Sequence, residues 1–217
     1  MPDLLHISSS PRGDASRSLA LARTFTEAYR TTRPDAVIEH WDLWDGTLPA
    51  FGPAAAHAKM ATIAGEPFTV DQEAAYRQIK DAFARFDAAD SYLFSVPMWN
   101  ATVPYILKQF IDVVSQPGLT FGFDPDSGYT GLLEGKRAVL IYTSDVWAPG
   151  RPPAFGSDFR QPYLETWLRW AGITDITAVR QPAATAVADP DDLWHRSRAE
   201  VTAAAVALGS TGRTAAA

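Results

Sequence analysis

The fold is indicated most strongly by the run Leu4-Leu5-His6-Ile7-Ser8-Ser9-Ser10-Pro11-Arg12-Gly13-Asp14-Ala15-Ser16-Arg17-Ser18. Its first four residues predict a short strand. The segment 16–29 carries apolar side chains at roughly helical spacing, which predicts a helix. The serine-rich loop 8–18 therefore joins a strand to the helix that follows it.

The same alternation continues along the chain to residue 208. Further strands are expected at 37–43, 91–96, 137–143 and 173–179, and further helices at 71–86, 104–114, 158–171 and 191–208. This alternation indicates an α/β fold, a doubly wound five-stranded parallel sheet with helices on both faces. We expect one domain, 1–208, with an insertion at 49–67 and a hairpin or loop excursion at 116–129. The low-complexity end, 209–217, is expected to be a disordered tail.

Composition and charge exclude several classes of protein. The 217 residues are 47% apolar, which excludes disorder over most of the chain. A net charge of -6 disfavours nonspecific binding to nucleic acid or to an anionic membrane. The absence of cysteine excludes disulfides, thiolate nucleophiles and iron–sulfur clusters. Because the four histidines are scattered we expect no metal, and because no signal peptide or membrane span is visible we expect a cytoplasmic protein.

The ligand of such a sheet is expected in the loops that follow its strands. In an open α/β sheet, ligands bind outside the carboxyl ends of the strands, where the strand order reverses. The loops 8–18, 97–102 and 143–148 are therefore the candidates.

The first of these loops favours a phosphate. Five serines and two arginines crowd the loop 8–18 of this acidic chain. The free N–H groups and the dipole at a helix start stabilise such an anion. The alternative is that Ser16 only caps the helix, as serine often does.

The loop after the third strand favours a flat ring. It is the run Pro97-Met98-Trp99-Asn100-Ala101-Thr102-Val103-Pro104, in which two prolines stiffen the backbone. A tryptophan wall with an amide beside it suits a heteroaromatic ligand. The alternative is a packed core tryptophan with a turn-forming asparagine.

Taken together, these loops resemble those of the FMN-dependent NADH-azoreductase family, relatives of the NAD(P)H:quinone oxidoreductases with a flavodoxin-like fold. The resemblance covers the chain to about residue 208. It is carried in order by Ser10, Ser16-Arg17-Ser18, Pro97-Met98-Trp99-Asn100, Pro104, Leu107-Lys108, Asp112, Gly118-Leu119-Thr120-Phe121, Pro162-Tyr163-Leu164 and Trp170-Ala171-Gly172-Ile173.

The resemblance implies a set of site residues. FMN would be held by Ser10, Ser16, Arg17, Ser18, Pro97, Met98, Trp99, Asn100, Ala101, Thr143, Ser144, Asp145 and Val146. The substrate pocket would include Phe123, Trp147 and Trp170. In the family, the aromatic residues that match Phe123 and Trp170 reach the active site of the partner subunit, so the resemblance also implies a homodimer.

Two departures from the family pattern concern the substrate side. The family often has phenylalanine where this chain has Ala101, and the smaller residue opens space beside the flavin. The family's Ser-Arg-Gly-Gly loop is here Ser144-Asp145-Val146-Trp147, which removes a positive charge and restricts the backbone. From these changes we expect quinones to be better acceptors than azo dyes.

The implied activity is an FMN-dependent NAD(P)H oxidoreductase. It passes a hydride from NADH or NADPH to bound FMN and then to a quinone or azo acceptor in a ping-pong sequence, and it needs no metal and no catalytic side chain, because the flavin carries the chemistry. Three alternatives stay open: a flavodoxin-like electron carrier without turnover, a hydrolase resembling an acyl-carrier-protein phosphodiesterase, and a reductase that uses FMN as a diffusible substrate.

Overall fold

The computed structural model describes residues 1–211 and contains a five-stranded sheet in the order β2-β1-β3-β6-β7. All four neighbouring pairs are parallel. The strands are β1 (Leu4–Ser8), β2 (Ile38–Asp42), β3 (Ser91–Pro97), β6 (Arg137–Thr143) and β7 (Asp175–Gln181). The chain leaves β1 for the edge at β2 and returns to the other side of β1 at β3. The strand order therefore reverses between β1 and β3, and the expected α/β architecture is confirmed.

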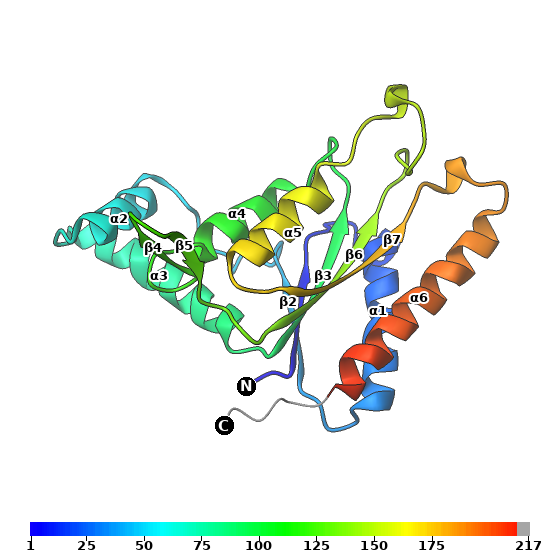
Figure 1. Ribbon diagram of the computed structural model, residues 1–217, viewed down its shortest axis with the longest axis horizontal. Helices are drawn as coiled ribbons and strands as arrows, with labels where there is room; N and C mark the ends of the chain where they lie inside the picture. The colour runs from blue at the N-terminus through cyan, green and yellow to red at the C-terminus, as the bar shows by residue number, and fades with distance from the viewer. Residues whose placement is uncertain (212–217) are drawn as a thin grey trace.

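Helices cover both faces of this sheet (Figure 1). Helices α1 (Arg17–Thr32) and α6 (Pro190–Ser210) pack side by side on one face. Helices α3 (Val70–Asp87), α4 (Tyr105–Val114) and α5 (Arg160–Trp170) bury their apolar sides on the other. Short 3-10 turns lie at η1 (Gly13–Ala15), η2 (Pro153–Phe155) and η3 (Ala184–Ala186).

The central strands are apolar on both sides because both sheet faces are covered. In β3, Tyr92 and Phe94 belong to the core beneath α3, α4 and α5, whereas Leu93 between them belongs to the core beneath α1 and α6. Successive side chains of a strand point to opposite faces. This explains why β3 has a continuous apolar run in the sequence.

Two stretches outside the basic alternation have regular structure. The expected hairpin is β4 (Phe121–Asp124) paired antiparallel with β5 (Gly128–Gly131). The expected insertion contains a helix that the sequence analysis missed, α2 (Pro53–Ala64), which packs against α3. Its buried side is a narrow row of alanines, which is a weak periodic signal. Proline at its start and Gly65 after its end, at φ 68°, were the available signals.

The expected boundary of the tail was wrong by two residues. Helix α6 continues through Gly209 to Ser210, because Gly209 lies against α1. A Cβ at this glycine would lie 2.9 Å from Cγ2 of Thr32. The rest of the expected tail, 212–217, lies outside the described residues. In the described part of the chain, 1–211, no helix has the length and apolar character needed to cross a membrane.

Candidate functional site

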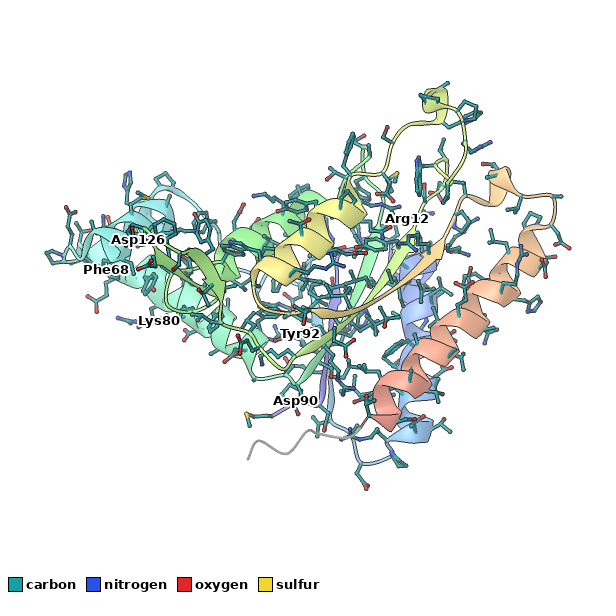
Figure 2. The ribbon with its side chains drawn as sticks, viewed as in Figure 1. Arg12, Phe68, Lys80, Asp90, Tyr92 and Asp126 are labelled. Carbon is teal, nitrogen blue, oxygen red and sulfur yellow. The ribbon has the colours of Figure 1, made fainter. Side chains whose placement is uncertain are left out.

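Three loops meet at the carboxyl ends of β1, β3 and β6, as expected for this sheet order. They enclose a cavity of about 60 Å³, lined by Ser10, Arg12, Ser16, Arg17, Pro97, Met98, Trp99, Thr143, Ser144 and Asp145. Most of the residues that the sequence analysis selected as cofactor ligands therefore come together. Figure 2 shows Arg12 at the end of the sheet from which the long loop after β6 projects.

Four selected residues do not line this cavity. Ser18 is fully buried in the first turn of α1, and its hydroxyl lies 3.1 Å from that of Ser16. Val146 is 55% exposed. Asn100 and Ala101 are the two central residues of a tight turn between Trp99 and Thr102. For Ser18, only the backbone N–H at the helix start remains available to a ligand.

The start of α1 combines a capping role with a binding surface. The Ser16 hydroxyl accepts a hydrogen bond from the N–H of Leu19 at 3.3 Å, so Ser16 does cap the helix. The same residue lines the cavity, and the first turn of α1 contains no acidic side chain. The N–H groups of this turn have no intrahelical acceptors, and with the helix dipole they favour an anion.

Two arginines add positive charge at this helix start. Nη1 of Arg12 lies 3.8 Å from Oδ2 of Asp145, and Nη1 of Arg17 lies 3.7 Å from Oδ1 of the same carboxylate. Both arginines belong to the loop that favours a phosphate, but only Arg17 is among the residues that the family resemblance implies. Hydroxyls, free N–H groups and two guanidinium groups together form a donor set that fits a phosphate monoester.

The loop after β3, which also lines the cavity, contains a tight turn with a strained backbone. The N–H of Trp99 donates to the carbonyl of Thr102, and the N–H of Thr102 donates back to Trp99, both at 2.9 Å. Asn100 and Ala101 between them have φ of 48° and 68°. Such a two-residue turn requires positive φ at both central positions, which asparagine tolerates better than alanine. The turn fixes Trp99 at the rim of the cavity.

A second, apolar cavity adjoins the first at Trp99. It has a volume of about 400 Å³ and is lined by Trp99, Asn100, Thr102, Val103, Tyr105, Lys108 and Tyr163. Burial, followed by the charge of Asp112, raises the pKa of Tyr163 to about 12, so its phenol is neutral near pH 7. Tyr105 and Tyr163 were not predicted as pocket residues from the sequence, because their contribution depends on how α4 and α5 pack.

None of the three expected pocket residues lines either of these cavities. Trp147 lines a different cavity of about 290 Å³, together with Ser144. Phe123 is 62% exposed on the β4–β5 hairpin. The ring of Trp170 packs beside this hairpin, 4.7 Å from the ring of Phe121 and 5.6 Å from that of Tyr129. Within one chain, the structure does not bring Phe123 or Trp170 to the site.

The buried histidine of β1 has a structural role. Nε2 of His6 lies 3.0 Å from the hydroxyl of Ser95, and its ring stacks on His40. Burial, with a smaller contribution from His40, lowers the pKa of His6 to about 3. Within residues 1–211, no group of three or more His, Cys, Asp or Glu side chains is placed to hold a metal ion.

Comparison with known proteins identifies the family. A family profile described as flavodoxin-like fold matches residues 2–205. A protein of Ruegeria pomeroyi named FMN-dependent NADH:quinone oxidoreductase is 43% identical over 204 residues, which cover 94% of this chain and 100% of the relative. The chain belongs to the FMN-dependent NADH:quinone oxidoreductase family. The resemblance found in the sequence is thereby confirmed.

Solved structures of azoreductases share the fold of this FMN-dependent NADH:quinone oxidoreductase family member. An FMN-dependent NADH-azoreductase of Bacillus anthracis, crystallised in complex with FMN, is 25% identical with a TM-score of 0.84, over 96% of this chain and 100% of that one. Another azoreductase of Bacillus anthracis is 22% identical with a TM-score of 0.86, over 95% and 100%. The second likeness concerns the fold alone.

Proposed function

We propose that this protein is an FMN-dependent NADH:quinone oxidoreductase whose flavin binds at the carboxyl ends of β1, β3 and β6. One observation carries the proposal: three separate loops line a single cavity, to which one loop contributes serines and arginines and another contributes Trp99. The curated relative that aligns with 94% of this chain carries the same activity in its name.

The chain's residues fit the two ends of FMN separately. The phosphate would be held by Ser10, by the N–H groups at the start of α1, and by Arg12 and Arg17. The ring would rest against the segment 97–99, with Ser144 and the backbone of the loop after β6 beside it. A cavity of 60 Å³ is too small for the whole cofactor, so the tricyclic ring would extend along the Trp99 side toward the apolar cavity.

When bound, FMN supplies the redox chemistry, taking a hydride from NADH or NADPH and passing the reducing equivalents to the acceptor. The protein would bind the flavin, orient the donor and the acceptor against it, and exclude water from the site. Trp99 and Tyr105 offer an apolar surface at the neighbouring cavity, where a flat acceptor such as a quinone can stack. Cytoplasmic localisation would place the enzyme with its nicotinamide donor.

A homodimer would complete the site. Phe123 and Trp170 line neither cavity of their own chain. Their rings pack with Tyr129 where the hairpin meets the end of α5, and Phe123 and Tyr129 are exposed there. In a dimer Phe123 and Trp170 would reach the partner's apolar cavity. Ala101 and the loop 144–147, with Trp147, would favour quinones over azo dyes.

The first test is the visible spectrum of FMN-reconstituted protein under anaerobic conditions, before and after NADH is added. Rapid bleaching of a protein-bound flavin band is expected. A bound flavin that stays oxidised with NADH and NADPH would indicate an electron carrier. Absence of a bound flavin would contradict the proposal and leave the hydrolase and the diffusible-flavin reductase to be tested.

A variant pair tests the phosphate position. Ser16→Asp keeps an oxygen that can cap α1 but puts a negative charge beside the phosphate. We expect FMN affinity to fall about tenfold or more, which corresponds to about 1.4 kcal/mol, while riboflavin affinity changes less. Thr69→Asp is the matched control, because Thr69 caps α3 outside the cavity lining. Equal FMN affinity in both variants would show that the phosphate lies elsewhere.

A further inference from the structure

A buried ion pair at the start of α5 contacts the strand ends that carry the candidate site. The side chains of Arg160 and Asp158 are only 2% and 6% exposed. Nε of Arg160 donates to Oδ1 of Asp158 at 3.0 Å, and Nη2 donates to Oδ2 at 2.8 Å. A bidentate pair of this kind holds the guanidinium plane in one orientation.

The remaining guanidinium nitrogen bridges the ends of two strands. Nη1 of Arg160 donates to the carbonyl oxygen of Thr143 at 2.5 Å and lies 3.4 Å from that of Val96. Val96 is next to the last residue of β3, and Thr143 is the last of β6. The carbonyl of Thr143 also accepts the N–H of Met98 at 2.9 Å. Arg160 therefore touches the backbone at the point where both cavity-lining loops leave the sheet.

The residue before Arg160 extends this contact to the strained turn. The N–H of Phe159 donates to the carbonyl of Ala101 at 2.9 Å. Ala101 has a φ of 68°, a conformation that an L-residue holds only when its surroundings impose it. The segment 158–160 is thus bonded to the ends of β3 and β6 and to the turn that carries Trp99.

We propose that Arg160 is a positioning residue for the flavin site: it sets the spacing between the loops 97–102 and 144–147. This inference rests on the proposed function, since it assigns those loops to FMN. A buried ion pair contributes little to stability compared with apolar residues of similar volume. Stability therefore does not explain why this ion pair is buried here. Its contact with the carbonyls at the ends of β3 and β6 does explain it, because the contact holds these two strand ends in place. Lysine cannot replace Arg160, because one ammonium group cannot hold Asp158 in two-point contact and also bridge both carbonyls.

The experiment separates positioning from stability. The N–H of Arg160 also donates to Oδ1 of Asp158, at 2.9 Å, so the replacement at 158 has to keep an acceptor. The double variant Asp158→Asn with Arg160→Met removes both charges together and keeps an amide oxygen for this N–H. No buried charge is left uncompensated, and the urea midpoint of unfolding should stay close to that of the original protein. FMN binding is then followed by flavin fluorescence and by the visible circular dichroism of the bound ring. We expect an altered dichroism band, weaker FMN binding, and reduction by NADH that is slower by about 100-fold, the effect of misplacing a reacting group by about 1 Å.

Two further variants keep the test decisive. Arg160→Lys retains a charge against Asp158 and is used if the double variant does not fold; it should show the same altered dichroism. Arg169→Met, which removes an exposed ion pair with Glu165 on the same helix, is the matched control and should keep the original flavin signals.

The outcomes distinguish this inference from the proposed function. If the original protein binds and reduces FMN while a folded Arg160 variant matches it in dichroism, affinity and rate, the positioning role is wrong and the function stands. If the original protein binds no FMN, the proposed function is wrong and the inference is overturned with it.

Discussion

Single residues at the site carry strain and charge that a sequence pattern does not reveal. Ala101 lies in the left-handed region, at φ 68°, next to Asn100 at 48°. For an L-residue with a Cβ, this conformation costs about 1–2 kcal/mol relative to the right-handed helical region, whereas glycine adopts it freely. Favourable packing elsewhere in the protein therefore offsets the strain of the turn that holds Trp99.

Ala101→Gly should stabilise the protein. We expect the free energy of unfolding to rise by up to about 1 kcal/mol, because the relief of strain exceeds the extra entropy that glycine adds to the unfolded chain. Urea denaturation followed by circular dichroism measures the change. Ala74→Gly, at an exposed position of helix α3, is the control and should lower stability by about 1 kcal/mol. A less stable Ala101→Gly variant would contradict the strain argument.

Asp145→Asn should strengthen FMN binding. The carboxylate of Asp145 lies 3.7 Å from Arg17 and 3.8 Å from Arg12, where it weakens their attraction for a phosphate. Because these groups are about half exposed or more, the gain should be modest, about threefold, and should shrink at high salt. Titrations with FMN and with riboflavin measure it, and only FMN should respond. Asp14→Asn is the control, because the carboxylate of Asp14 pairs with Arg23 and not with Arg12 or Arg17.

At the scale of elements, the hairpin depends on one close backbone contact. A Cβ on Gly131 of β5 would lie 2.2 Å from the nitrogen of Gly172 and 2.4 Å from the carbonyl carbon of Ala171. Both atoms are backbone at the end of α5 and have little freedom to move. The N–H of Leu133 donates to the carbonyl of Ala171 at 2.9 Å, which anchors the chain just after the hairpin.

Gly131→Ala should therefore displace the hairpin from α5 and lower the free energy of unfolding by more than about 2 kcal/mol. The fluorescence of Trp170 should shift, because its ring packs against Phe121 and Tyr129 of the hairpin. Gly122→Ala is the matched control in β4, since the nearest atom to its Cβ would be 4.0 Å away. If the two variants were equally stable, the close approach at Gly131 would not limit the position of the hairpin.

At the scale of the whole molecule, stability depends on a buried histidine in β1, an interior strand of the sheet. Burial is the main cause that lowers the pKa of His6 from 6.5 to about 3. Below pH 6.5 the unfolded chain therefore binds a proton that the folded chain excludes. The contribution of neutral His6 is fully present above pH 6.5 and is lost as the pH falls toward 3.

We expect the free energy of unfolding to fall by about 1.6 kcal/mol between pH 6.5 and pH 5 from this histidine. Its slope is half-developed at pH 6.5 and reaches about 1.4 kcal/mol per pH unit near pH 5. His6→Gln, which retains a group that can hydrogen-bond Ser95, should flatten the slope in urea denaturation series at the two pH values. His195→Gln, at an exposed position of α6, should keep the original slope. If the free energy of unfolding changed equally with pH in His6→Gln and in the original protein, His6 would not be the source of this pH dependence.

Much of the fold and part of the site could be predicted because the signals are local. Apolar periodicity placed all five strands of the main sheet, and parallel strands bring the loops that follow them to one edge. Helix α2 was missed because its buried row is alanine. Ser18 was expected to be a cofactor ligand, yet its side chain is fully buried. The sequence could not show this, because it does not reveal which side of the first turn of α1 faces the sheet.

The sequence by itself determined the order of strands and helices, the three loops of the site and the excess of phosphate donors in one of them. These properties depend on residues that are close together in the chain, so a local sequence pattern is enough to predict them. Only the tertiary structure decided that Asp145 sits between Arg12 and Arg17, and that Arg160 bridges Val96 and Thr143. Such contacts join residues far apart in the chain, and they are set by strand register and by the angle at which helices pack, which no local pattern encodes.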